Sequence, residues 1–121
     1  MPDTHGQPYY LTFIVDADFA VELKKTAASD PAHFEIESET ENRDATKLGF
    51  DLSTVAQIAT VISGTITTGR LAVDIYRWWS KSRAEKAIIK TPMKTLELHK
   101  HLQPTVEEIE RFLTESRALV K

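Results

Sequence analysis

Cysteine is absent from the 121 residues of the chain, and its absence excludes several kinds of chemistry. Disulfide bonds, thiolate nucleophiles and cysteine-based zinc sites all depend on this residue. Glycine is scarce as well: the four glycines, at positions 6, 49, 64 and 69, are scattered and form no phosphate-binding loop. No serine or histidine stands in a recognised nucleophile motif. We therefore expect a protein that is not an enzyme and that holds no cofactor or metal ion.

The beginning of the chain lacks the features of a targeting segment. Residues 1–6 carry neither a basic start nor an apolar stretch, so a secretory signal peptide is not expected. The hydrophobic fraction of 41% and the charged fraction of 27% are ordinary for a globular domain. At 121 residues the chain is long enough for one domain with a modest core. We expect a single cytoplasmic domain over residues 1–121, with residues 1–8 flexible.

Acidic and basic residues are divided unevenly along the chain, although the net charge is only −3. Residues 1–51 contain four Lys or Arg and eleven Asp or Glu, whereas residues 77–100 contain seven Lys or Arg and two Glu. Such a division favours oriented docking onto a charged partner. The alternative is that the acidic and basic parts face each other within the fold.

The first third of the chain predicts a strand, a helix and a second strand. Residues 9–15 are rich in aromatic and β-branched side chains, which is typical of a buried strand. Asp16 or Asp18 is a suitable N-cap for a helix over residues 19–28. Residues 33–41 alternate between apolar and acidic side chains, so this strand is expected to expose one face to water. That predicted face consists of Glu35, Glu37, Glu39 and Glu41.

A long helix is predicted next, from about Leu52 to Arg83, because apolar residues recur there at helical spacing. Its first part, residues 52–69, is uncharged and nearly long enough to span a membrane, but its many Ser, Thr and Gln residues argue against insertion. Small side chains recur every four residues and form a ridge that allows close helix packing. The ridge consists of Ala56, Thr60, Gly64 and Thr68. We expect it to pack against the sheet of the same chain, with the interface of a homo-oligomer as the alternative.

The last third of the chain predicts a β-hairpin and a helix. Residues 86–91 and 95–100 flank a turn that contains proline. Thr105 and Glu108 form a capping-box pattern before a helix over residues 106–120. The complete order is strand, helix, strand, long helix, strand, strand, helix. It predicts an α+β fold with a small mixed or antiparallel sheet of about four short strands, and with helices packed on one face.

The best candidate for a binding surface lies at the end of the predicted long helix. Two adjacent tryptophans stand there among basic residues, and adjacent helix positions point about 100° apart, so one ring can be buried while the other stays at the rim. A rim tryptophan beside a cation is typical of protein-binding surfaces. The predicted surface comprises Arg77, Trp78, Trp79, Lys81 and Arg83. Single-stranded nucleic acid is an alternative ligand, but the acidic composition and the lack of a recognition motif argue against it.

With its elements in this order, the chain resembles the effector-associated constant component family, a small α+β domain of bacterial conflict systems. The resemblance is a pattern that covers most of residues 9–120. Its features are the strand at residues 11–15, the uncharged segment at residues 54–71 that runs into Tyr76-Arg-Trp-Trp79, the hairpin at residues 87–98 and the last helix. The hairpin turn departs from the family, whose members tend to have glycine where this chain has Pro92-Met93-Lys94.

The resemblance implies a binding protein without catalytic residues of its own. In that family the component accompanies an effector, often a trypsin-like or caspase-like peptidase, and links it to the rest of the system. We therefore expect a non-catalytic adaptor of a bacterial defence system that binds such an effector. The alternative is an antitoxin or immunity protein that neutralises a toxin by direct binding, in which the acidic residues 35–41 would meet a basic toxin.

Overall fold

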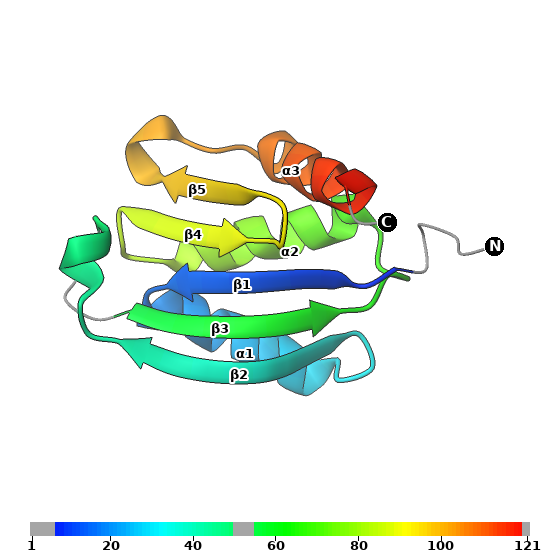
Figure 1. Cartoon of the computed structure of the whole chain (residues 1–121), viewed down its shortest axis with the longest axis horizontal. Helices are drawn as coiled ribbons and strands as arrows, with labels where there is room; N and C mark the ends of the chain where they lie inside the picture. Colours follow the sequence, from blue (N-terminus) through cyan, green and yellow to red (C-terminus); the bar gives the residue numbers. More distant parts are fainter. Residues whose placement is uncertain (1–6, 50–54, 120–121) are drawn as a thin grey trace.

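The computed structural model describes residues 7–49 and 55–119, which fold into a five-stranded antiparallel sheet with three α-helices (Figure 1). The strands are β1 (Tyr9–Val15), β2 (Phe34–Asn42), β3 (Val55–Ile62), β4 (Lys86–Lys90) and β5 (Thr95–His99). The helices are α1 (Ala17–Ser29), α2 (Thr68–Lys81) and α3 (Val106–Leu119), and the short 3₁₀ segments are η2 (Ala45–Leu48) and η3 (Lys100–Leu102). The predicted α+β class is confirmed, with five strands in place of four.

The strands follow the order β2-β3-β1-β4-β5 across the sheet, and each neighbouring pair is antiparallel. Helix α1 connects β1 to β2, with β3 between them, and α2 connects β3 to β4, with β1 between them. This pair of split crossovers is the β-α-β-β-α-β arrangement known as ferredoxin-like. The β4–β5 hairpin extends that sheet by one strand, and α3 follows it.

The three helices pack on one face of the sheet, as predicted. Figure 1 shows α1 and α2 behind the sheet, and both views place α3 beside α2. A single buried cluster contains residues of all three helices, such as Leu113 of α3, together with alternate residues of the strands, such as Phe13 of β1. On the opposite face, a smaller cluster of Ile14, Val55 and Ile88 contains no helix residue. In the described part of the chain, no α-helix covers that second face.

The prediction of one long helix over residues 52–83 is wrong. Residues 52–54 lie outside the described part of the chain, and residues 55–62 form β3, which pairs with both β1 and β2. Residues 63–67 make the connection that follows, and α2 begins only at Thr68. Among the residues that the structure describes, no helix is both long and apolar enough to cross a membrane.

The error in this prediction arises from the spacing of three isoleucines. Ile58, Ile62 and Ile66 stand four residues apart. An interval of four suits one face of a helix, but it is also an even number, so it equally suits one face of a strand. Ile58, Thr60 and Ile62 are buried on the same face of β3. The many β-branched side chains of this segment favour the strand.

The predicted ridge of small residues does not exist as one surface, because its members belong to three different segments. Ala56 and Thr60 lie on β3, Gly64 lies in the turn after it, and Thr68 is the first residue of α2. The buried Thr60 hydroxyl donates a hydrogen bond to the Leu11 carbonyl oxygen at 2.8 Å. The alternative of a homo-oligomer formed through the long helix therefore loses its basis.

The acidic residues of β2 do not share one face. The pairing of β2 with β3 shifts between Ile36 and Ser38, where a β-bulge interrupts the alternation of side chains. The bulge divides the predicted acidic row into Glu35 and Glu37 on the uncovered face and Glu39 and Glu41 on the helix-covered face. The Glu39 carboxylate accepts a hydrogen bond from Lys24 Nζ of α1 at 3.0 Å.

The other predicted elements are confirmed within a few residues. Asp16 is the N-cap of α1, and its carboxylate accepts a hydrogen bond from the Phe19 amide at 3.2 Å. The hairpin forms as strands β4 and β5. At the start of α3, the Thr105 hydroxyl accepts from the Glu108 amide at 3.3 Å, as the capping pattern predicts. Residues 1–6 of the segment predicted to be flexible lie outside the described residues.

Candidate protein-binding groove

Helix α2 positions most of the predicted binding surface. Its N-cap is Thr67, whose hydroxyl accepts a hydrogen bond from the Arg70 amide at 3.2 Å. One side of α2 is buried, and the other exposes residues at the i, i+3, i+4, i+7 spacing of a single helix face. These residues, called here the α2 stripe, are Val73, Tyr76, Arg77 and Ser80. Val73 is 51% exposed and Tyr76 is 38% exposed, so the stripe presents two large apolar side chains to solvent.

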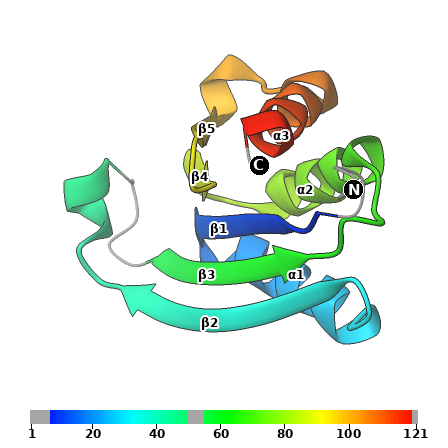
Figure 2. The same ribbon diagram turned by 45° about the vertical axis from the view of Figure 1, so that its right-hand side comes forward.

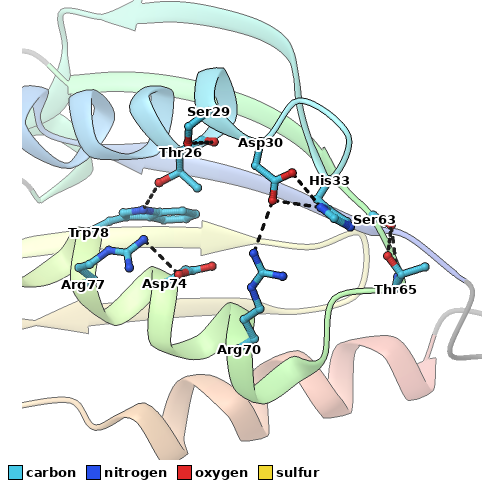
Figure 3. Close-up of polar contacts among 10 residues, drawn as sticks. All are labelled: Thr26, Ser29, Asp30, His33, Ser63, Thr65, Arg70, Asp74, Arg77 and Trp78. Atoms are coloured by element: carbon cyan, nitrogen blue, oxygen red, sulfur yellow. Dashed lines mark hydrogen bonds and ion pairs between the residues drawn. The ribbon is translucent and has the colours of Figure 1, made fainter.

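Trp78 lies in the centre of the core and does not contribute to a surface, contrary to the prediction. Its side chain is fully buried, and its ring meets those of Phe13, Phe19 and Phe34 edge-on at centroid distances of 5.9, 6.0 and 6.1 Å. The indole Nε1 donates a hydrogen bond to the Thr26 hydroxyl of α1 at 3.0 Å (Figure 3). Trp78 therefore joins α2 to α1, β1 and β2.

Trp79 is also buried, with 3% of its surface exposed, so neither tryptophan stays at the rim as the predicted surface required. The Lys100 ammonium lies 4.0 Å from the centroid of its ring. The same ammonium donates a hydrogen bond to the Trp79 carbonyl oxygen at 2.8 Å, in the last turn of α2. Burial lowers the pKa of Lys100, and the carboxylates of Asp16 and Glu85 oppose that shift. Lys100 thus brings a cation to the end of α2.

The C-terminal end of α2 is fixed by the carboxylate of Asp16. This buried carboxylate accepts hydrogen bonds from the Ser82 hydroxyl at 2.8 Å and from the Arg83 amide at 2.9 Å. Because Asp16 is also the N-cap of α1, the same side chain ties the first turn of α1 to the end of α2. The Arg83 guanidinium points outward and pairs with Asp18 at 3.3 Å.

A groove of about 680 Å³ lies between the C-terminal half of α2 and the segment that leads into α3. Tyr76 and Ser80 of the α2 stripe line one side, residues 103–107 line the other, and Trp79 and Lys100 lie between them. Gln103 has a left-handed backbone conformation with φ of 48°, which is uncommon for a residue with a side chain. Such conformations are often found in functional segments. The groove between α2 and residues 103–107 is called here the α2–α3 groove.

At the opposite end of α2, the two helices are in close contact. A Cβ atom at Gly69 would lie 2.8 Å from an oxygen of the Glu110 carboxylate, so a larger residue there would displace the Glu110 side chain. Figure 2 shows α2 and α3 side by side. The helices therefore touch near Gly69 and are separated by the α2–α3 groove near Trp79.

The basic residues of the predicted surface occupy different positions relative to this groove. Arg77 belongs to the α2 stripe beside Tyr76, and its guanidinium pairs with Asp74 at 3.1 Å (Figure 3). Lys81 is exposed one turn further along the helix, and it forms no ion pair within the described part of the chain. Arg83 lies beyond the end of α2. Arg77 and Lys81 are therefore the two basic residues of the predicted surface that lie exposed on α2.

A second polar cluster joins the end of α1 to the beginning of α2 (Figure 3). The Asp30 carboxylate contacts His33 Nδ1 at 2.8 Å and the Arg70 guanidinium at 3.5 Å. Each of the three charged or titratable groups has a partner within the cluster, which is typical of a structural link between two helices. In residues 7–49 and 55–119, no group of three or more His, Cys, Asp or Glu side chains is arranged to hold a metal ion.

Three residues of the α2–α3 groove could not be recognised from the sequence. Tyr76 follows Val73 at the same helical spacing as the buried apolar residues, so the sequence does not distinguish it from the core, although it is exposed on α2. Lys100 is 21 residues from Trp79 along the chain, and the two meet only because the β4–β5 hairpin returns toward α2. The left-handed conformation of Gln103 has no signal in the sequence, because glycine or asparagine is the usual residue there.

Comparisons of the chain with models of known families, with characterised proteins and with solved structures find no match.

Proposed function

We propose that this chain is a non-catalytic adaptor of a bacterial conflict system, which acts in the cytoplasm and binds an effector protein of the same system. The α2–α3 groove is the proposed binding site. The observation that carries the proposal is the exposed Tyr76 at the side of a groove of about 680 Å³, with Arg77 beside it. Tyrosine and arginine are among the residue types that most often dominate protein–protein binding energy, and they do so in well-packed pockets at the centre of an interface.

The charges around the groove indicate the chemistry of the partner. Arg77 and Lys81 are exposed on α2, Lys100 lies within the groove, and Glu107 lines the side opposite α2. A partner segment with an apolar side chain for the groove and acidic residues on the side that faces α2 would match this arrangement. The resemblance to the effector-associated constant component family adds the class of partner, a trypsin-like or caspase-like peptidase.

Nucleic acid is a less suitable ligand for this fold. Ferredoxin-like RNA-binding domains stack bases on aromatic side chains of the uncovered sheet face. In the described part of this chain, Tyr10 is the only Phe, Tyr or Trp side chain on that face, and Glu35 and Glu37 stand on the strand at its edge. We therefore propose a protein partner.

An antitoxin or immunity protein is the second candidate function. The observation that favours it is the exposure of Glu35 and Glu37 on the edge strand β2, where they would meet a basic toxin. The neighbouring genes distinguish the two candidates: a peptidase-like effector supports the adaptor, and a small basic nuclease supports the immunity protein.

Substitutions on the α2 stripe are expected to weaken effector binding without unfolding the domain. Tyr76→Ala and Arg77→Glu should each reduce affinity about tenfold or more, because central Tyr and Arg contacts are worth about 2 kcal/mol or more. The effector would first be identified by affinity capture from the native host and mass spectrometry. Binding of each purified variant would then be measured by titration calorimetry.

Matched controls test the location of the site. Tyr10→Ala removes an exposed tyrosine from the opposite face of the sheet, and Arg43→Glu reverses an exposed charge in the loop after β2. Both controls should bind the effector like the unmodified protein, and all four variants should keep its circular dichroism spectrum. Unchanged affinity in both Tyr76→Ala and Arg77→Glu would show that the α2–α3 groove is not the binding site.

A further inference from the structure

The uncovered face of the sheet has an open end and a closed end. At the closed end, Ile14, Val55 and Ile88 are buried. At the open end, Tyr10 is 48% exposed and stands over a shallow hollow of about 320 Å³. The floor of this hollow is uncharged and includes Thr12 and Ala59. An exposed tyrosine over a small uncharged depression is suited to contact with another protein surface.

Opposite charges stand on the two sides of this hollow. Glu37 of β2 lines one side, and Lys90 of β4 lines the other. Neither side chain has a hydrogen-bond or ion-pair partner within the described part of the chain. On this face, the acidic strand β2 and the basic strand β4 therefore lie on either side of the uncharged rows of β3 and β1.

The strand register places these two charges at the same level. Thr12 of β1 pairs with Ala59 of β3 on one side and with Lys90 on the other. Ala59 in turn pairs with Ser38, the residue after Glu37. Glu37 and Lys90 therefore stand at nearly the same height along the strands. Three strand spacings, about 14 Å, separate β2 from β4.

This arrangement is self-complementary under a two-fold rotation. Consider a two-fold axis that is parallel to the strands and runs in front of the sheet, between β3 and β1. Rotation about it places β2 of a second copy opposite β4 of the first, and β4 opposite β2. The rotation leaves each residue at the same level along the strands. A second copy related by that axis would place its Glu37 opposite Lys90 and its Lys90 opposite Glu37. Tyr10, which pairs with Val61 in the sheet, would meet Val61 of the second copy. Both ion pairs and both apolar contacts form at once, as an isologous interface requires.

We infer that the open end of the uncovered sheet face binds a second copy of this chain, through Tyr10 and two reciprocal Glu37–Lys90 ion pairs. The contact uses none of the residues of the α2–α3 groove. Each protomer of the dimer therefore keeps its groove free, and the dimer presents two grooves.

Reversal of the paired charges tests the inference. By analytical ultracentrifugation, the unmodified protein is expected to show a reversible, concentration-dependent monomer–dimer equilibrium. Glu37→Lys and Lys90→Glu should each raise the dimer dissociation constant roughly tenfold, because each replaces two attractions with two repulsions. The double variant Glu37→Lys/Lys90→Glu should dimerise like the unmodified protein. An equimolar mixture of the two single variants should also form dimers, because opposite charges then face each other again.

Lys81→Glu is the matched control for Lys90→Glu. It makes the same charge change on α2, away from the proposed contact, and should leave the dimer dissociation constant unchanged. A second variant, Tyr10→Glu, should abolish the dimer while the far-ultraviolet circular dichroism stays native. The inference is overturned if the unmodified protein is monomeric at every concentration, or if the single variants dimerise unchanged. It is equally overturned if neither the double variant nor the mixture recovers the dimer.

Discussion

Replacement of Trp78 by alanine is expected to destabilise the domain by about 3–5 kcal/mol, a large fraction of the about 5–15 kcal/mol that stabilises a typical domain. The ring fills the space between three phenylalanines from β1, α1 and β2, so its removal leaves a cavity in the centre of the core. Urea unfolding monitored by circular dichroism measures the change in the free energy of unfolding.

Two comparisons separate the contributions of Trp78. Trp78→Phe keeps an aromatic ring but removes the hydrogen bond to Thr26, so its cost should be smaller than that of alanine. Tyr76→Ala, two residues away on the exposed side of the same helix, should change the free energy of unfolding by only about 0.5 kcal/mol. A loss below about 1 kcal/mol for Trp78→Ala would contradict its placement in the core.

Asp16→Ala is expected to have the second-largest effect, a loss of about 2–4 kcal/mol in the free energy of unfolding. The buried carboxylate accepts hydrogen bonds from the Phe19 amide, the Ser82 hydroxyl and the Arg83 amide. Its removal leaves the Ser82 hydroxyl and two backbone amides without this acceptor. It also takes away one of the negative charges that favour the protonated form of Lys100. Thermal and urea unfolding of the purified variant measure the loss.

The control for Asp16 is its neighbour Asp18, which is also acidic and lies in the first turn of α1. Asp18 is half-buried, and its carboxylate pairs with the exposed Arg83 guanidinium, so Asp18→Ala should cost less than about 1 kcal/mol. Equal losses for the two alanine variants would show that Asp16 is an ordinary helix-dipole residue and does not join α1 to α2.

Much of the fold could be predicted from local signals in the sequence. The strand at residues 9–15, the cap at Asp16, the hairpin around Pro92 and the last helix each depend on residues close together in the chain. Hydrophobic alternation, capping side chains and turn residues report such local structure directly. The α+β class followed from the order of these elements.

The central strand β3 was missed for a physical reason. Its isoleucine spacing satisfies both periodicities, and only the pairing with β1 and β2 decides between them. The bulge in β2 was missed for a related reason. The glutamates alternate regularly in the sequence, and the extra residue at the bulge is apparent only in the pairing of β2 with β3. Both features depend on contacts between distant segments.

The candidate site proposed from the structure and the surface predicted from the sequence both include the end of α2, but they differ in their residues. Both tryptophans of the predicted surface are buried, and the exposed aromatic residue is Tyr76. Adjacent helix positions point about 100° apart, and a helix covered by both a sheet and a third helix can bury two neighbours at once. The position of Lys100 over the Trp79 ring could not be read from composition or spacing, because the two residues meet only through the return of the β4–β5 hairpin toward α2.

Site-specific photocross-linking in the native host tests the central claim most directly. A photoreactive phenylalanine analogue would replace Tyr76 in one variant and Tyr10 in another, and the products would be identified by mass spectrometry. The account predicts that position 76 cross-links to an effector protein of a conflict system, whereas position 10 cross-links to a second copy of this chain. Cross-links from position 10 to the effector, with none from position 76, would contradict it.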